Sequence, residues 1–427
     1  MALVLVALLL AACSEERSGG DDRDGEAATA GQIDPGGGTC DDPDLLVCAR
    51  ASTIGDLVPD APEVATGEPI TVGMVNQENT PGGSFPEMSR ATAAFVSFVN
   101  EQLGGVDGRP IRLEVCDTGF SAEGSAACGQ RFAEQGVPAV LGGIDVFGNA
   151  VDVLGESGIP YVGGIPISIP SMTAPTSFQF SGGIWGAAEA FARHATDELG
   201  ARSVAIVYGD FGSVADAARG AESTLRDRGV EVAMVPFPVV STDMGAPMQA
   251  AWSNRPDAVF VLTADTGCAA AFDAAATIGI TAPTFYTGAC AAPSVIERVG
   301  DRADGAFFNV EQEVRADADQ SDTDLYTSVL AAEDPDLQPI GAGTVAAKSF
   351  VNLYSILRQL GGDGISPEAI SAALRAQRDA PSFMGHPYTC DGRQFPDLPA
   401  ACSPQQVIVE LDDGELRQVS DWISVDR

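Results

Sequence analysis

The fold class is decided by the stretch that opens with Pro69-Ile70-Thr71-Val72-Gly73-Met74-Val75 and ends with Ile111-Arg112-Leu113-Glu114-Val115. Both runs are short and rich in branched apolar residues, which is typical of strands. Between them, apolar residues recur every three or four positions from Ala91 to Leu103, which predicts a helix ending at Gly104-Gly105. Strand, helix and strand in this order form a βαβ unit. The loop after its first strand, Asn79–Pro86, lies where open α/β sheets place ligands.

The alternation of strand and helix continues along the chain. Further apolar runs predict strands at residues 139–141, 159–162, 203–208, 230–237, 258–262, 284–286 and 305–309. Helical periodicity is found between them and again in a long segment from Thr344 to Leu360. Such a series predicts an α/β protein with parallel sheets flanked by helices. The series restarts after Phe178-Gln179-Phe180-Ser181, which predicts a change of lobe at this point.

The chain is long and strongly acidic. Its 427 residues are enough for two domains, and 60 acidic against 23 basic residues give a formal net charge of -37. A surface of this sign repels nucleic acid and anionic lipid headgroups, so neither is expected as a partner. The sequence has no P-loop, no G-x-S-x-G elbow and no G-x-G-x-x-G motif after a strand. We therefore expect neither an enzyme nor a cofactor.

The first residues are typical of an export signal. Met1–Ala12 is small and apolar but too short to cross a bilayer, and it ends in Leu10-Ala11-Ala12-Cys13. This run resembles a bacterial lipoprotein signal, which implies that Cys13 becomes the lipidated N-terminus. No Lys or Arg precedes the apolar run, which leaves open a start further upstream. Residues 13–68 are rich in glycine, proline and charge, and predict a flexible tether with one small stapled loop.

Cysteine spacing predicts disulfides. Of the nine cysteines, those other than Cys13 fall into close pairs along the chain, namely Cys40 and Cys48, Cys116 and Cys128, Cys268 and Cys290, and Cys390 and Cys402. An even, locally spaced set in an exported chain is typical of disulfides, although spacing does not fix the connectivity. A metal site is not expected, because there is no C-x-x-C motif and the two histidines, His194 and His386, are far apart.

The run Asn100-x-x-x-Gly-Gly-Val-x-Gly-Arg-x-Ile111, after a helix and before a strand, resembles the leucine/isoleucine/valine-binding protein family. Further matches are the Tyr208-Gly209-Asp210-Phe211-Gly212 loop and Arg255-Pro256-Asp257-Ala258-Val259. The resemblance implies a two-lobed type I periplasmic-binding-protein fold, with a parallel sheet flanked by helices in each lobe and three crossovers between the lobes. The implied boundaries are residues 69–180 plus 310–385 for lobe one, and residues 181–309 plus 386–427 for lobe two.

The loops that bind the ligand in this family differ here. In relatives that hold an α-amino acid, hydroxyl and main-chain N–H groups of lobe one hold the carboxylate, and an acidic residue of lobe two holds the ammonium. The matching loops are Asp145–Asn149, which lacks Ser and Thr, Gly163–Ser168, where more hydroxyl groups are expected, and Thr287–Ala289, which lacks an acid. The departure predicts a ligand other than a branched-chain amino acid. We expect a small organic molecule with an apolar or aromatic body, with or without one cationic group.

The predicted ligand-binding residues follow strands of both lobes and are Phe85, Asp145, Phe147, Gly164, Tyr208, Phe211, Asp265 and Thr266. Phe147 is either a ligand-facing ring or a core plug. Asp265 either binds an ammonium group or caps the following helix. The Cys268–Cys290 pair would staple two loops beside the site and limit their freedom.

The resemblance implies an extracytoplasmic solute-binding protein that delivers its ligand to the permease of an ABC importer. A membrane contact is expected only through the lipid anchor, on the outer face of the cytoplasmic membrane. The alternative is a tethered sensor that presents its ligand-bound form to a membrane receptor. Permease and ATPase genes beside this one would favour the importer, whereas a receptor kinase gene would favour the sensor.

Overall fold

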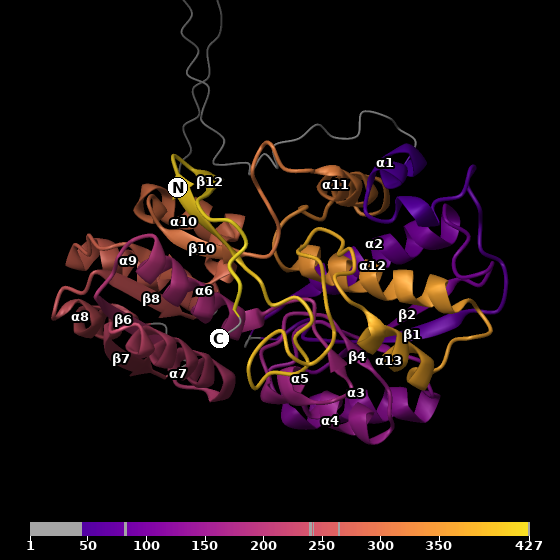
Figure 1. Ribbon diagram of the computed structural model, residues 1–427, viewed down its shortest axis with the longest axis horizontal. Helices are drawn as coiled ribbons and strands as arrows, with labels where there is room; N and C mark the ends of the chain where they lie inside the picture. Colours follow the sequence, from indigo (N-terminus) through magenta and orange to yellow (C-terminus); the bar gives the residue numbers. More distant parts are fainter. Residues whose placement is uncertain (1–44, 81–82, 239–240, 242, 264, 426–427) are drawn as a thin grey trace, which may run out of the picture. The chain divides into compact units, whose positions relative to one another are not determined.

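The computed structural model describes residues 45–80, 83–238, 241, 243–263 and 265–425, without the side chains of Asp265 and Thr266. Within this part of the chain, two sheets each carry helices on both faces (Figure 1). We call the five-stranded sheet with its helices the first lobe, and the seven-stranded sheet with its helices the second lobe. The predicted α/β class, with largely parallel sheets flanked by helices, is confirmed.

The sheet of the first lobe is wholly parallel and has the order β2-β1-β3-β4-β5. Its strands are β1 (Ile70–Asn76), β2 (Ile111–Asp117), β3 (Val140–Gly142), β4 (Tyr161–Val162) and β5 (Ser177–Phe178). Strands β1 and β2 pair in register from Ile70 with Ile111 to Asn76 with Asp117. The βαβ unit from Pro69 to Val115 therefore forms one side of this sheet, with β2 at its edge.

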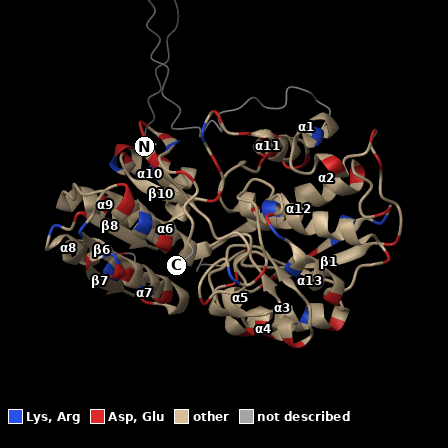
Figure 2. Ribbon diagram, viewed as in Figure 1, with Lys and Arg blue, Asp and Glu red and all other residues tan. Residues whose placement is uncertain are grey.

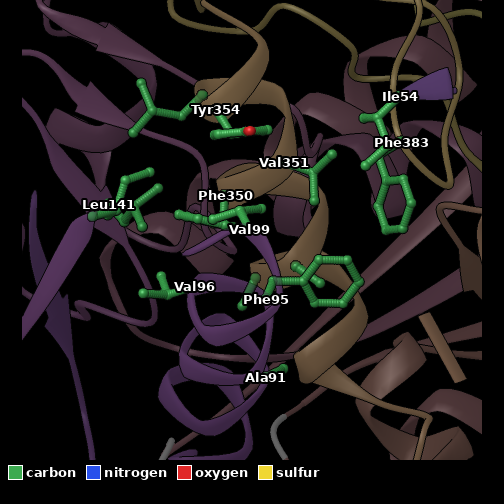
Figure 3. Close-up of a cluster of buried hydrophobic side chains, with 14 of the residues drawn as sticks. Ile54, Ala91, Phe95, Val96, Val99, Leu141, Phe350, Val351, Tyr354 and Phe383 are labelled. Carbon is green, nitrogen blue, oxygen red and sulfur yellow. The ribbon is translucent and has the colours of Figure 1, made fainter. Parts of the chain in front are cut away.

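The helices of the first lobe pack in two groups. The group of α2 (Pro86–Glu101), α11 (Ser321–Glu333), α12 (Ala342–Leu360) and α13 (Pro367–Ala376) buries one core. On α2, Phe95 lies beside the ring of Phe383, at a centroid distance of 5.5 Å (Figure 3). Phe95 also stacks on Tyr326 of α11, at a centroid distance of 6.0 Å. The other group is α3 (Ala122–Gln135) and α4 (Asn149–Glu156), with the short α5 (Ile169–Thr173) beside α4.

The sheet of the second lobe has the order β12-β11-β10-β9-β8-β6-β7, with β11 antiparallel to both of its neighbours. Its strands are β6 (Ser203–Gly209), β7 (Glu231–Phe237), β8 (Ala258–Leu262), β9 (Thr284–Tyr286), β10 (Phe307–Val310), β11 (Val407–Asp412) and β12 (Glu415–Gln418). One core lies under α6 (Gly183–Asp197) and α7 (Gly212–Asp227). The other lies under α8 (Gly245–Trp252), α9 (Asp265–Ile278) and α10 (Pro293–Val299). Short 3-10 turns follow β9 (η2, Gly288–Ala291) and α10 (η3, Gly300–Ala303).

The chain passes between the two lobes at three places, as predicted. The first crossover, residues 179–182, connects β5 to α6, and the second begins at Glu311, directly after β10. The third ends at Gln406, directly before β11. The first and third crossovers are joined by main-chain hydrogen bonds, because the Gln179 N–H donates to Ala400 and the Cys402 N–H donates to Gln179, both at 2.8 Å.

The structure differs from the predicted tether over residues 45–68. Helix α1 (Leu45–Ala51) and the turn η1 (Gly55–Leu57) pack on the first lobe, with Leu46 and Ile54 buried in its core. Thr53 fixes the segment, since its main-chain N–H donates to Asp322 on α11 at 2.7 Å. Residues 13–44 of the predicted tether, including Cys13 and Cys40, and the predicted signal peptide lie outside the described residues.

The exact lobe boundaries stay a prediction, but one segment departs from them. Residues from 386 onward were assigned to lobe two, yet Tyr388, Cys390 and Cys402 are buried in the core of the first lobe. Tyr388 packs edge-on against Phe180 at 4.8 Å between ring centroids. The segment that leads to β11 therefore lies against both lobes, since Phe395 and two further residues belong to the core of the second.

Three of the predicted disulfides are confirmed, namely Cys116–Cys128, Cys268–Cys290 and Cys390–Cys402. The pair of Cys40 and Cys48 is not tested, because Cys40 is not among the described residues. In the described part of the chain, none of the helices combines the length and the apolar character needed to cross a bilayer. The same residues contain no group of His, Cys, Asp and Glu side chains placed to hold a metal ion.

Candidate functional site

The predicted site residues lie at the carboxyl ends of parallel strands. Most lie on loops, whereas Tyr208 lies within β6 and Asp265 and Thr266 begin α9. The loops at this edge follow β1, β2, β3 and β4 in the first lobe and β6, β8 and β9 in the second. Loops from the two lobes touch, because the Ser213 hydroxyl at the start of α7 donates a short hydrogen bond to the Ile167 carbonyl after β4. Open α/β sheets bind ligands at this edge, so we built the candidate site from these loops.

Three phenylalanine rings from three different loops contact one another, and we call them the aromatic cluster. Phe147, after β3, lies 5.7 Å from Phe120, after β2, and 6.5 Å from Phe211, after β6, measured between ring centroids. The Phe147–Phe211 contact is edge-to-face and joins the two lobes. Aromatic rings that are not packed in a core offer faces and edges to a flat or apolar ligand. Phe147 is half-buried and contacts a ring of the other lobe, which does not fit a core plug, and its contact with a ligand stays a prediction.

Phe120 was missed by the sequence analysis. It occupies the position between the end of β2 and the cap of α3, and the rule that singled out loops after strands applies to it equally. Its side chain is 38% exposed, which is unusual for a phenylalanine. Its φ of 52° lies in the left-handed region, where a residue with a bulky side chain is strained. Strain of this kind is often found at functional sites.

Asp145 does not face the aromatic cluster as a free carboxylate. It is 3% exposed, and its Oδ2 accepts the Ser125 hydroxyl of α3 at 2.6 Å. Burial raises the pKa of Asp145, against the opposing effect of hydrogen bonds from Ser125 and from nearby main-chain amides. Ser125 Oγ in turn accepts the Ala150 N–H of α4 at 2.8 Å. Asp145 thus helps to fix the loop that carries Phe147, and its contact with a ligand stays a prediction.

Gly164 has a structural reason to be glycine. Its N–H donates to Ser349 Oγ on α12 at 2.9 Å, so this donor is not free for a ligand carboxylate. Its φ is 89°, and a Cβ at this position would lie 2.6 Å from the carbonyl carbon of Gly142. The close approach of the loops after β3 and β4 therefore requires glycine at this position.

Phe85 stands at the start of α2, and its ring packs partly against the core of the first lobe. Its carbonyl accepts Asn76 Nδ2 at 2.8 Å, and Asn76 Oδ1 accepts the Ile144 N–H at 2.9 Å. Fully buried Asn76, at the end of β1, thereby joins the loop of Phe85 to the loop of Phe147. The sequence analysis did not select Asn76, although a polar residue at the end of a buried strand is a usable signal.

The remaining predicted residues belong to the second lobe. Tyr208 is half-buried and packs against the core under α6 and α7, at the level where β6 pairs with Leu262 of β8. Asp265 and Thr266 form the first turn of α9, and their side chains are not described. The disulfide Cys268–Cys290 joins this helix to η2 after β9, as the predicted staple required.

Two cavities lie away from the aromatic cluster. One, of about 450 Å³, is lined by the first residues of β1 and β2 together with Arg109 and Pro367. The other, of about 520 Å³, lies between α6 and the end of the chain and is lined by residues that include His194 and Trp422. At each cavity an arginine is already engaged, because Arg109 donates to the Glu68 and Gly362 carbonyls and Arg315 pairs with Asp421. We therefore prefer the strand-end loops as the ligand site.

Comparison with family models and solved structures agrees with this topology. The model of the periplasmic binding protein family matches residues 69–398. The chain belongs to this family. The match begins directly before β1 and ends within the third crossover, so it covers the first lobe and the second lobe up to β10 of this periplasmic binding protein. Comparison with curated protein sequences gave no match.

Several solved structures share the fold at low sequence identity. An ABC transporter substrate-binding protein from Sphaerobacter thermophilus is 20% identical, with a TM-score of 0.70, and the match covers 84% of this chain and 99% of that one. The branched-chain amino acid binding protein LivJ from Streptococcus pneumoniae, in complex with isoleucine, is 16% identical at TM-score 0.68, covering 83% and 100%. A solute-binding protein from Rhodopseudomonas palustris, in complex with 4-hydroxybenzoate, is 18% identical at TM-score 0.68, covering 84% and 98%. The recognition of the leucine/isoleucine/valine-binding type is confirmed at the level of the fold.

Proposed function

We propose that this periplasmic binding protein captures a small organic ligand between the strand-end loops of its two lobes and delivers it to an ABC importer. The observation that carries the proposal is the aromatic cluster, in which rings from loops of both lobes meet at the carboxyl ends of the strands. A ligand held there contacts both lobes at once, which couples binding to the relative position of the lobes. The membership in a family of binding proteins argues against an enzyme.

The ligand we propose has an aromatic or apolar body. Aromatic side chains favour flat and apolar groups through stacking and edge contacts. A cationic group on the ligand stays a prediction that depends on Asp265, whose side chain is not described. The related folds were solved with isoleucine and with 4-hydroxybenzoate, which makes amino acids and aromatic acids the first classes to test here.

We also propose that Cys13 carries a lipid that holds the protein on the outer face of the cytoplasmic membrane. The support is the run Leu10-Ala11-Ala12-Cys13 at the end of a short apolar segment. The expected result is that the protein is recovered with the membrane fraction of cells that express it, and that the Cys13→Ser variant is recovered from the extracytoplasmic soluble fraction. Membrane recovery of the Cys13→Ser variant would contradict the anchor.

A thermal-shift screen of the full chain tests the ligand proposal. The probes are leucine, isoleucine, phenylalanine, 4-hydroxybenzoate, 3,4-dihydroxybenzoate and benzamide. A ligand present at a thousand times its Kd stabilises the folded state by about 4 kcal/mol, which raises Tm by roughly 8–16 °C for domains of this size. We expect such a rise with an aromatic probe. A rise with leucine and isoleucine alone would contradict the proposed ligand class.

A further inference from the structure

A buried polar network connects the three crossovers, and its centre is the carboxylate of Glu311. Glu311 Oε1 accepts the Ser181 hydroxyl of the first crossover at 2.6 Å and Gln406 Nε2 of the third crossover at 2.9 Å. Glu311 itself begins the second crossover, directly after β10. One carboxyl oxygen of the second crossover thus accepts hydrogen bonds from both the first and the third crossover.

The ammonium of Lys348 completes the network from the first lobe. Lys348 is the only lysine of the chain, lies on α12 and is 3% exposed. Its Nζ donates to the Glu311 carbonyl at 3.1 Å and lies 3.5 Å from Glu311 Oε2. A buried ammonium is very costly without a partner of opposite charge, so Glu311 must stay beside it.

The network continues into the second lobe. Gln406 Oε1 accepts Asn309 Nδ2 at 2.9 Å, and Asn309 Oδ1 accepts the Gly288 N–H at 2.8 Å. Gly288 is the first residue of η2, the turn that follows β9, and belongs to one of the strand-end loops of the candidate site. A continuous chain of hydrogen bonds therefore leads from α12 of the first lobe to a loop beside the ligand site in the second.

Movement of one lobe against the other must change backbone angles in the crossovers. Ser181, Gln406 and Lys348 can all reach Glu311 only when the three crossovers hold one arrangement. Hydrogen bonds to a carboxylate are stronger than those between neutral groups, and a buried network of them is costly to break in part. The network therefore favours the arrangement in which Ser213 also contacts Ile167 across the lobes.

We propose that Glu311 and Lys348 are positioning residues that hold the three crossovers in this arrangement and thereby set the equilibrium between closed and open lobes. Neither residue belongs to the loops that we assign to the ligand, so they act on affinity through the population of the closed form. If only a tenth of the molecules are closed, the apparent Kd is ten times the intrinsic value. The proposal extends the solute-binding function to the control of closure.

Small-angle X-ray scattering of the ligand-free protein tests this proposal without knowledge of the ligand, alongside thermal unfolding. The variants are Glu311→Gln, Lys348→Met, the double variant Glu311→Gln/Lys348→Met and the milder Ser181→Ala. We expect a larger radius of gyration than in the wild type for all four. We expect Tm to fall in both charge variants, because each leaves a buried group without its partner, and to recover in the double variant.

The double variant separates a hinge role from a merely structural one. With a hinge role it recovers Tm but keeps the larger radius of gyration, because the neutral pair no longer ties the crossovers together. With a merely structural role it recovers both, and the proposal is overturned. If the charge variants do not fold, Ser181→Ala is the deciding variant, because it keeps the ion pair. A larger radius of gyration supports the hinge role, and an unchanged radius overturns it. The matched control is Asp334→Asn, which breaks the Arg90–Asp334 ion pair within the first lobe and should leave the radius of gyration unchanged.

Discussion

Phe211 makes the contact on which the binding proposal depends most. Phe211 lies at the start of α7 in the second lobe, and its ring makes an edge-to-face contact with Phe147 of the first lobe. Aromatic pairs contribute roughly 0.5–1.5 kcal/mol beyond the area they bury, and a similar gain is available to an aromatic ligand that replaces one of the rings. The ring is thus suited both to closing the lobes and to binding a flat molecule.

Replacement of this ring should weaken ligand binding without unfolding the protein. For Phe211→Ala we expect the Kd for the best aromatic probe to rise by roughly two- to tenfold, the range that corresponds to the loss of one aromatic contact. Isothermal titration calorimetry measures it. The matched control is Leu199→Ala, which removes an exposed apolar side chain after α6 and should leave the Kd unchanged. Equal affinity of the wild type and Phe211→Ala would contradict the role of the cluster.

His194 provides a second test at the level of a single residue. Its side chain is buried on α6, with the rings of Phe285 and Phe307 both 5.9 Å away between centroids. Burial lowers the pKa of His194, against the weaker opposing effect of Glu198. The unfolded chain therefore takes up a proton at a higher pH than the folded protein does, and stability falls as the pH drops below about 6.5.

Removal of the imidazole should reduce this pH dependence. We expect urea unfolding of the wild type at pH 7.5 and pH 5.5 to show a loss of stability on acidification that is smaller in His194→Gln. Carboxyl groups titrate in both proteins, so the difference between the two slopes isolates His194. Identical slopes in the wild type and the variant would show that the buried histidine does not contribute.

At the level of elements, the apolar runs predicted the inner strands β1, β3, β6, β8 and β9 well because these strands are almost wholly buried. Ser121 caps α3, because its side chain accepts the Gly124 N–H at 3.0 Å. Helix α1 was missed, because its burial depends on packing against α11 and not on a pattern within its own seven residues.

Side-chain direction explains most of the errors at the site. The loops after the strands were placed correctly from sequence, but loop residues follow no period that fixes where a side chain points. Asp145 turned out to bond Ser125 on α3, which is distant in sequence. Phe120 was overlooked because it falls between two predicted elements. Tyr208 lies at the predicted strand end, but its ring packs into the core of its own lobe.

The docked segment 45–68 gives a prediction at this scale. Thr53 donates both its N–H and its hydroxyl to Asp322. Burial raises the pKa of Asp322, and the hydrogen bonds from Thr53 oppose this rise. Thr53→Val removes the hydroxyl donor, and hydrogen bonds to charged groups contribute about 1.5–3 kcal/mol. We expect a loss near the lower end of this range in urea unfolding, because Thr53 is exposed. Ser97→Ala, on the exposed face of α2, is the control, and a loss equal to that of the control would restore the tether interpretation.

At the level of the whole molecule, acidic residues are found on helices around both sheets (Figure 2). The one lysine is not on this surface but at the centre of the crossovers. The net charge of -37 keeps such a protein apart from other acidic surfaces and favours solubility. In contrast to the acidic surface, the crossovers between the lobes contain a buried positive charge, Lys348, which lies beside the carboxylate of Glu311.

The most direct test of the binding account is hydrogen–deuterium exchange of the full chain, with and without the compound that gives the largest thermal shift. A ligand held between the strand-end loops should slow amide exchange in residues 143–149 of the first lobe and in residues 209–215 of the second, in the same sample. Protection of both segments is the predicted result. Protection confined to one lobe, or to the cavity between α6 and the end of the chain, would contradict the account.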